Sequence, residues 1–300
     1  MTTPPLLKRK KQVIITIFFV LSLAIGSYFV APSPTSLPMT KNDDSCRCDS
    51  ASLDPFEEPK SYSRGRYQGI CIDSCKYRSG RQVTSPIQDQ PVLHVANLYH
   101  EDSFWTAKLP IKEIQSAHFV FEEFRPHINH TAVKIEFKRP IELKSQTDIY
   151  KVAFIKNILI SPEGIPVKDQ KYNFLDGILG NYTVAYRLES FKAYEAVARK
   201  LNHKLSLYEL SLEEVNMGEF ISSALQTSQK ESYMVSYNLF LNNCATTTLS
   251  LLVASQHPEN IEHSTELWTS SLNHLAHRFP LSEGLGTLWS LRVLGFVKGH

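Results

Sequence analysis

The sequence predicts an α+β protein in which an antiparallel sheet packs on helices, preceded by one N-terminal transmembrane helix. Two neighbouring stretches, 116–124 and 130–137, alternate apolar and polar residues with the period of β-strands. Residues 190–202 have helical spacing, and a second helix is expected to open at Ser211. Residues 12–31 form an apolar run of bilayer length. Together these patterns indicate an exported domain attached to a membrane.

The N-terminus has the arrangement of an anchor. The basic run Lys8–Lys11 comes directly before the apolar segment 12–31, which favours a cytoplasmic tail over residues 1–11 and export of the rest. A cleaved signal peptide is the alternative. Residues 32–44 are rich in Pro, Ser and Thr and are typical of a linker. The prediction is a single-pass membrane protein.

The composition excludes some classes of protein. With 42% hydrophobic, 21% charged and 11% aromatic residues, the chain can bury enough apolar surface to fold. Four of the 32 basic residues lie in the N-terminal run, so the remainder holds 28 basic against 30 acidic residues. This balance gives no support to nucleic-acid binding, and no nucleic-acid partner is expected.

The five cysteines fall into two groups. Cys244 stands alone, whereas four others cluster in the segment 45–90: Cys46, Cys48, Cys71 and Cys75. In an oxidising compartment this pattern favours two disulfides of unassigned pairing and one free thiol. A metal site made by the cluster is the alternative, although zinc sites usually use a different cysteine spacing. The favoured interpretation is a loop cross-linked by disulfides, with no metal and no cofactor.

Strands are expected over much of the domain 91–300. The stretches 116–124 and 130–137 flank a short turn and predict an antiparallel hairpin, with Pro140 closing its second strand. Further strands are expected over 149–160 and 181–189. The stretch before residue 116 has one short apolar run and is interpreted as irregular.

Helices are expected in the second half of the domain. Ser190 is placed to start the helix 190–202, and the pattern from Ser211 to Glu214 resembles a capping box that opens the next helix. Residues 233–255 are interpreted as an extended run entering a helix. Residues 259–300 are expected to be helical and amphipathic.

Cys244 is the strongest candidate for chemistry. Asn243 and Cys244 lie where polar sequence passes into an apolar helix. A cysteine at a helix N-terminus has its thiolate stabilised by the helix dipole and by free backbone N–H groups, and the same groups can bind a developing oxyanion. The alternative is structural, with Asn243 capping the helix and Cys244 acting as a small buried apolar residue.

A thiol nucleophile needs a general base, normally histidine. His130 begins one predicted strand, where its side chain can face a cleft, and His118 lies within the preceding strand. His130 is the first choice and His118 the second. A cysteine at a helix start beside a histidine at a strand start is the architecture of papain-like thiol sites. Here the histidine precedes the cysteine, which is the permuted order.

The chain also resembles a known family. The segments AHFVFEEF, HTAVKIEF and YNLFLNNCATTTLSLL, in this order between about Trp105 and Val253, are similar to DUF4105, the N-terminal periplasmic domain of the bacterial lipoprotein N-acyltransferase Lnb. The resemblance implies a permuted papain-like (NlpC/P60-like) fold at the outer face of the inner membrane. It implies Cys244 as nucleophile and His130 as base, with Asn243 either near the oxyanion or capping the helix.

The functional hypothesis is a membrane-anchored periplasmic acyltransferase or hydrolase that forms a thioester on Cys244. Its partners would be the inner membrane and an envelope lipid, lipoprotein or peptide. The Lnb-like acyltransferases continue into several membrane helices, whereas residues 259–300 hold no second apolar run of membrane length. The alternatives are a non-catalytic envelope binding or assembly protein and a peptidoglycan peptidase.

Overall fold

The computed structural model of the chain describes 71, 77–83, 92–125, 128–148, 150–166, 172, 176–177, 179–239, 243–256, 287–288, 291–292 and 294–297. The predicted tail, anchor and linker lie outside these residues, as do most of the cysteine segment and most of 259–300. None of the helices in the described ranges is long and apolar enough to span a bilayer.

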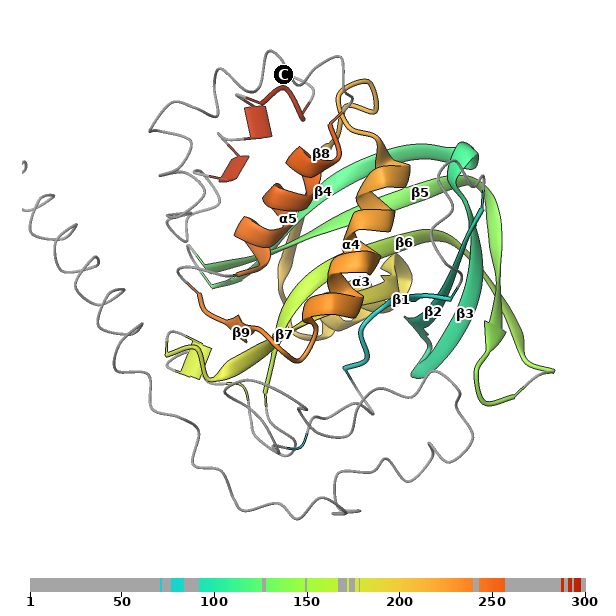
Figure 1. Cartoon of the computed structure of the whole chain (residues 1–300), viewed down its shortest axis with the longest axis horizontal. Helices are drawn as coiled ribbons and strands as arrows, with labels where there is room; N and C mark the ends of the chain where they lie inside the picture. The colour runs from blue at the N-terminus through green and yellow to red at the C-terminus, as the bar shows by residue number, and fades with distance from the viewer. Residues whose placement is uncertain are drawn as a thin grey trace, which may run out of the picture.

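The described chain is a sheet-dominated α+β structure with three α-helices (Figure 1). The strands are β1 (Arg81–Gln82), β2 (Val92–His100), β3 (Ser103–Pro110), β4 (Ile114–Arg125), β5 (Ile128–Ser145), β6 (Val152–Ile165), β7 (Tyr182–Ser190), β8 (Lys204–Glu209) and β9 (Ser236–Tyr237). The helices are η3 (Ile111–Glu113, a 3-10 turn), α3 (Phe191–Lys200), α4 (Met217–Glu231) and α5 (Cys244–Ala254).

The nine strands of the described residues belong to one sheet, in the order β1-β2-β3-β5-β6-β7-β9, with β4 pairing β5 and β8. A parallel pairing of β2 with β7, from Leu98↔Leu188 to Tyr99↔Glu189, closes β2, β3, β5, β6 and β7 into a barrel-like ring. The other strand pairs are antiparallel. The predicted α+β class with a mainly antiparallel sheet is therefore confirmed. The sequence did not predict the parallel pair that closes the ring.

The predicted hairpin is confirmed, because β4 and β5 pair from Ile114↔Phe137 to Arg125↔Ile128. The predicted end of the second strand at Pro140 is wrong. β5 continues to Ser145, and a register shift between Glu136 and Ile141 accommodates the proline, which cannot donate to a regular ladder.

Residues 92–110, interpreted from sequence as irregular, instead form the hairpin β2–β3. Its turn places Glu101 and Asp102 at positive φ (46° and 56°), and Asn97 in β2 also has a positive φ of 60°. Such angles are uncommon for residues other than glycine. The register shift between Val95 and Leu98 then breaks the alternation from which a strand is recognised.

The two faces of the sheet are covered by different helices. Helices α4 and α5 lie side by side over one face, and the main apolar core fills the space beneath them (Figure 1). Helix α3 covers the other face through a small cluster made of Val120, Ala132, Leu159 and Tyr194. Ser190 caps α3 by accepting a hydrogen bond from the backbone N–H of Ala193, as predicted.

The predicted start of α4 at Ser211 is wrong. Residues 212–214 form a turn, and α4 begins at Met217 with Asn216 as its N-cap. The Asn216 side chain accepts hydrogen bonds from the N–H groups of Gly218 and Glu219. Asparagine is as good an N-cap as serine, so the local signal at Ser211 was outcompeted by one five residues later.

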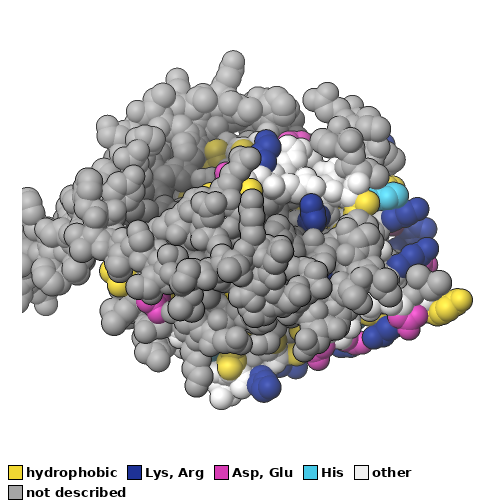
Figure 2. All heavy atoms as spheres, turned by 60° about the horizontal axis from the view of Figure 1, so that its bottom comes forward, with side chains coloured by type: hydrophobic (Ala, Val, Ile, Leu, Met, Phe, Trp, Pro, Cys, Tyr) yellow, Lys and Arg dark blue, Asp and Glu magenta, His cyan; other side chains and the backbone are white. Residues whose placement is uncertain are grey.

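The described surface is mixed in charge. On the face in Figure 2, the visible Lys and Arg side chains lie beside Asp and Glu side chains. Exposed ion pairs in the described chain include Arg139 with Glu113 and Lys192 with Glu101. Exposed pairs of this kind contribute little to stability, so the fold depends on its apolar core.

Candidate active site

Cys244 is the first residue of α5, as the sequence predicted. Asn243 is the N-cap: its side chain accepts a hydrogen bond from the Thr246 N–H at 3.0 Å, and the Thr246 hydroxyl accepts one from the Asn243 N–H at 3.0 Å. The Asn243 amide also donates to the Leu239 carbonyl at 2.7 Å. These contacts support the capping role of Asn243.

Helix α5 packs on β5 and β6, which brings the helix start to the beginning of β5. His130 lies there, buried with 7% of its surface exposed, and Cys244 is 4% exposed. The two side chains are hydrogen-bonded to one another. The structure therefore brings together the cysteine and the first-choice histidine named from sequence.

The environment favours charge on both partners. Burial by itself would raise the pKa of the Cys244 thiol, but the charge of His130 and hydrogen bonds from His130 and Thr131 lower it to about 7. Burial would likewise lower the pKa of His130. The charge of Cys244 and the hydrogen bond to it act in the opposite direction, with Glu163 and Glu122 adding to them, and the pKa is raised to about 9. Each charge stabilises the other, so the pair favours a thiolate with an imidazolium.

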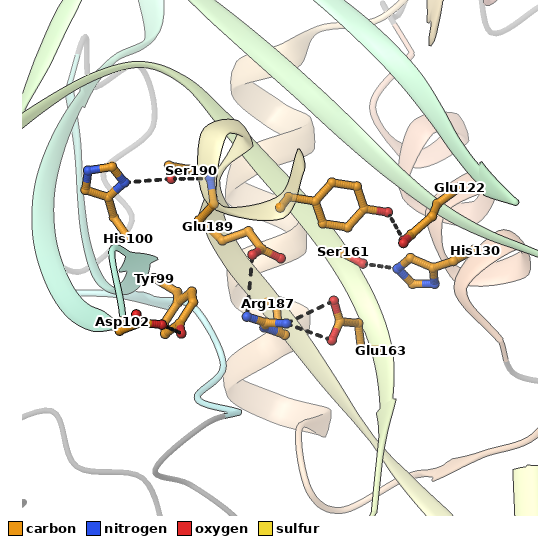
Figure 3. A network of polar contacts seen from close by, with 12 residues as sticks. Tyr99, His100, Asp102, Glu122, His130, Ser161, Glu163, Arg187, Glu189 and Ser190 are labelled. Atoms are coloured by element: carbon orange, nitrogen blue, oxygen red, sulfur yellow. Dashed lines mark hydrogen bonds and ion pairs between the residues drawn. The ribbon is translucent and has the colours of Figure 1, made fainter. Parts of the chain in front are cut away.

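His130 is held by two further contacts. Its Nε2 lies 2.5 Å from the hydroxyl of Ser161 on β6 (Figure 3). The ring of Phe124 stacks on the imidazole, with centroids 6.1 Å apart and planes 11° from parallel. Because Ser161 engages Nε2, Nδ1 is the ring nitrogen left for the thiol. Ser161 thus occupies the place of the third residue that orients the base.

His118 is not part of this pair. It lies four residues before Glu122 on β4, about 13 Å along the strand. Its register partners are Lys134 and Glu209. Burial and the charge of Lys134 lower its pKa, and Cys244 is not among the groups that affect it. The second-choice base from sequence is therefore placed away from the thiol.

Tyr237 is a site residue that the sequence did not reveal. It lies in β9, buried, and its ring fills the space beside Gly164, where an added Cβ would come within 2.5 Å of the ring. Burial raises the pKa of the Tyr237 phenol well above its usual value, and the charge of Cys244 raises it further. Hydrogen bonds link this phenol to both the side chain and the backbone of Cys244. The backbone N–H of Cys244 and the Tyr237 hydroxyl therefore both lie beside the Cys244 sulfur.

No local signal identified Ser161, Tyr237 or the carboxylates near His130. They come from β4, β6 and β9, and only the strand pairing brings them to the cysteine. In the described part of the chain, no group of three or more His, Cys, Asp or Glu side chains is arranged to hold a metal ion. Of the clustered cysteines only Cys71 is described, so the predicted disulfide pairing stays a prediction.

The fold and the site define a sheet-dominated α+β domain with a buried Cys–His pair at the junction of a helix and a strand. The chain belongs to the family described as Lnb N-terminal periplasmic domain, whose profile matches residues 101–274. This match spans more than half of the chain, includes both His130 and Cys244, and agrees with the resemblance found in the sequence. Comparisons with curated proteins and with solved structures found no match.

Proposed function

We propose that the chain is a periplasmic thiol enzyme, an acyltransferase or hydrolase, that works through a thioester on Cys244. The observation that carries the proposal is the buried thiol hydrogen-bonded to the His130 imidazole at a helix N-terminus. A helix that begins at the nucleophile and packs on the strand carrying the base is also the arrangement of a permuted papain-like fold, which we propose for this domain. Residues 12–31 would anchor it in the inner membrane.

His130 acts as the base by taking the Cys244 proton before the substrate binds, so the first half-reaction starts from the thiolate and the imidazolium. The thiolate attacks the substrate carbonyl, a sulfur–carbon bond forms, and the carbonyl electrons move onto oxygen. The Cys244 N–H and the Tyr237 hydroxyl, which both lie beside the sulfur, would donate hydrogen bonds to that oxyanion. When the intermediate collapses, the bond to the leaving group breaks and the leaving group takes the proton from His130.

In the second half-reaction an amine or water attacks the thioester and gives its proton to His130. The carbon–sulfur bond then breaks and the thiolate is regenerated. An amine acceptor makes the enzyme an acyltransferase, and water makes it a hydrolase. An envelope lipid, lipoprotein or peptide would supply the acyl or amide bond.

The test is labelling of the full-length protein with a thiol-reactive acyl probe across pH, with peptide mapping to locate the label. Because the thiol pKa is lowered to about 7, labelling of Cys244 should reach half of its maximal rate near that pH. His130→Ala removes the main counter-charge, so half-maximal labelling should move to alkaline pH. Cys244→Ser should give no label at this peptide.

A second candidate function is favoured by the 4% exposure of Cys244. A thiol this buried would suit a binding or assembly protein that keeps the fold with a silent site. Absence of label on Cys244 at every pH in the folded wild-type protein would favour this candidate and contradict the enzyme.

A further inference from the structure

His130 is flanked by carboxylates on the two strands beside it. On β4, Glu122 is paired directly with His130 in the antiparallel register. Directly opposed residues in such a register have Cβ atoms about 4.5 to 5.5 Å apart. On β6, Glu163 lies two residues after Ser161, whose hydroxyl is 2.5 Å from His130 Nε2, and the charge of Glu163 acts on the imidazole. The imidazole therefore lies between two acidic side chains.

Each carboxylate is fixed by its own partners. Glu122 is buried and accepts a hydrogen bond from the Tyr194 hydroxyl at 2.5 Å, and the Nδ1 of His203 lies 2.6 Å from its other oxygen. Glu163 is held by Arg187, whose Nη1 lies 3.2 Å from the carboxylate (Figure 3). Neither acid depends on His130 for its position, so both are in place before the imidazole is charged.

The other charged groups around the imidazole come from three directions. Cys244 on α5 contributes the negative charge of its thiolate. On β7, Arg187 contacts Glu163 and also Glu189, whose carboxylate lies 3.5 Å from Arg187 Nη2. Burial raises the pKa of Glu189, and the charge of Arg187 opposes this shift. His203, after α3, faces Glu122.

We propose that Glu122 and Glu163 are positioning residues that keep His130 in its imidazolium form, an inference that rests on the thiol site proposed above. Two opposite charges in a site closed to water favour the charged imidazole, as a neighbouring carboxylate does for any buried base. The sulfur at the helix start then needs no proton transfer before it attacks. The carboxylates do not touch the substrate, and they act through His130.

The test uses NMR of full-length protein labelled with ¹³C-histidine in the Cys244→Ser background, which removes the thiolate and leaves the carboxylates. The His130 signal is assigned by its loss in His130→Gln. Glu163→Gln and Glu122→Gln should each lower the titration midpoint of His130 by about one pH unit. Glu136→Gln is the matched control, because Glu136 lies on the same face of β5 and pairs with Lys134 and Lys156, and it should leave the midpoint unchanged.

A midpoint that stays in place in both glutamate variants overturns the proposal, whether or not Cys244 proves reactive. Glu163→Asp keeps the charge and should restore most of the midpoint, which separates charge from a packing defect. If a glutamine variant does not fold, the wild-type thiol and Glu163→Asp are compared by the ratio of alkylation with iodoacetate to that with iodoacetamide. An imidazolium favours the thiolate toward both reagents and in addition attracts the anionic one. The ratio should therefore fall as His130 loses its proton, and a ratio that stays constant also contradicts the proposal.

Discussion

Tyr237 is the residue whose proposed role can be separated most cleanly from its packing. Tyr237→Phe keeps the ring beside Gly164 and removes only the hydroxyl near Cys244. Loss of one oxyanion donor should slow acylation by an ester probe about 100-fold. Alkylation by iodoacetamide forms no oxyanion, so its rate should change little. Both rates are measured on the same preparation.

The control for this prediction is Tyr208→Phe, since Tyr208 packs edge-on against Phe121 on another strand. It should leave both rates near those of the wild type. Equal slowing of acylation and alkylation by Tyr237→Phe would contradict a role at the oxyanion and would point to a disturbed thiol instead.

The pair Cys244 and His130 could be predicted from the sequence because each has a local signature. Asn243 and the apolar residues after it indicate a helix N-terminus at the cysteine. His130 begins a stretch in which apolar and polar residues alternate clearly. Ser161 and Glu163 lie in a strand whose sequence has no pattern that marks a functional site, and their role depends on the pairing of β6 with β5. Long-range register cannot be read from one sequence, so these residues emerge only from the fold.

At the scale of elements, the start of α5 tests whether Asn243 acts by capping. Asn243→Ser keeps an oxygen that can accept from Thr246, so the free energy of unfolding and the acylation rate should stay close to wild type. Asn243→Ala loses the cap and should destabilise the fold by about 1 kcal/mol. Thermal unfolding and probe labelling measure the two effects. A large loss of acylation in a stable Asn243→Ser protein would instead support an oxyanion role.

The close approach of β6 to β9 depends on Gly164. A Cβ added there would lie 2.5 Å from Cδ1 and 2.7 Å from Cγ of Tyr237, so the buried ring must move. Gly164→Ala should lower the free energy of unfolding by about 1 to 3 kcal/mol and also slow acylation. The effects of Gly164→Ala and Tyr237→Ala should be non-additive in a double-mutant cycle. Additive losses would show that the two positions do not meet.

Local patterns predicted elements well where one face of a strand is apolar and the other polar. The hairpin β4–β5 and the cap of α3 at Ser190 were found this way. The hairpin β2–β3 was missed because Glu101 and Asp102 form its turn without glycine, and a bulge at Asn97 hides the alternation. The start of α4 was misplaced because two capping residues compete within six positions, and tertiary packing decides between them.

For the whole molecule, the central question is whether residues 12–31 attach the domain to the membrane. Residues 12–31 are apolar and follow four basic residues, so we expect a retained anchor with residues 1–11 in the cytoplasm. The protein should stay in the membrane fraction after an alkaline carbonate wash. Alkaline phosphatase fused after residue 300 should be active, because this enzyme folds only outside the cytoplasm, whereas a fusion after residue 11 should be inactive. Sequencing the N-terminus of the mature protein completes the test. A chain that begins at residue 32, with the apolar segment removed, would show a cleaved signal peptide and leave the domain free in the periplasm.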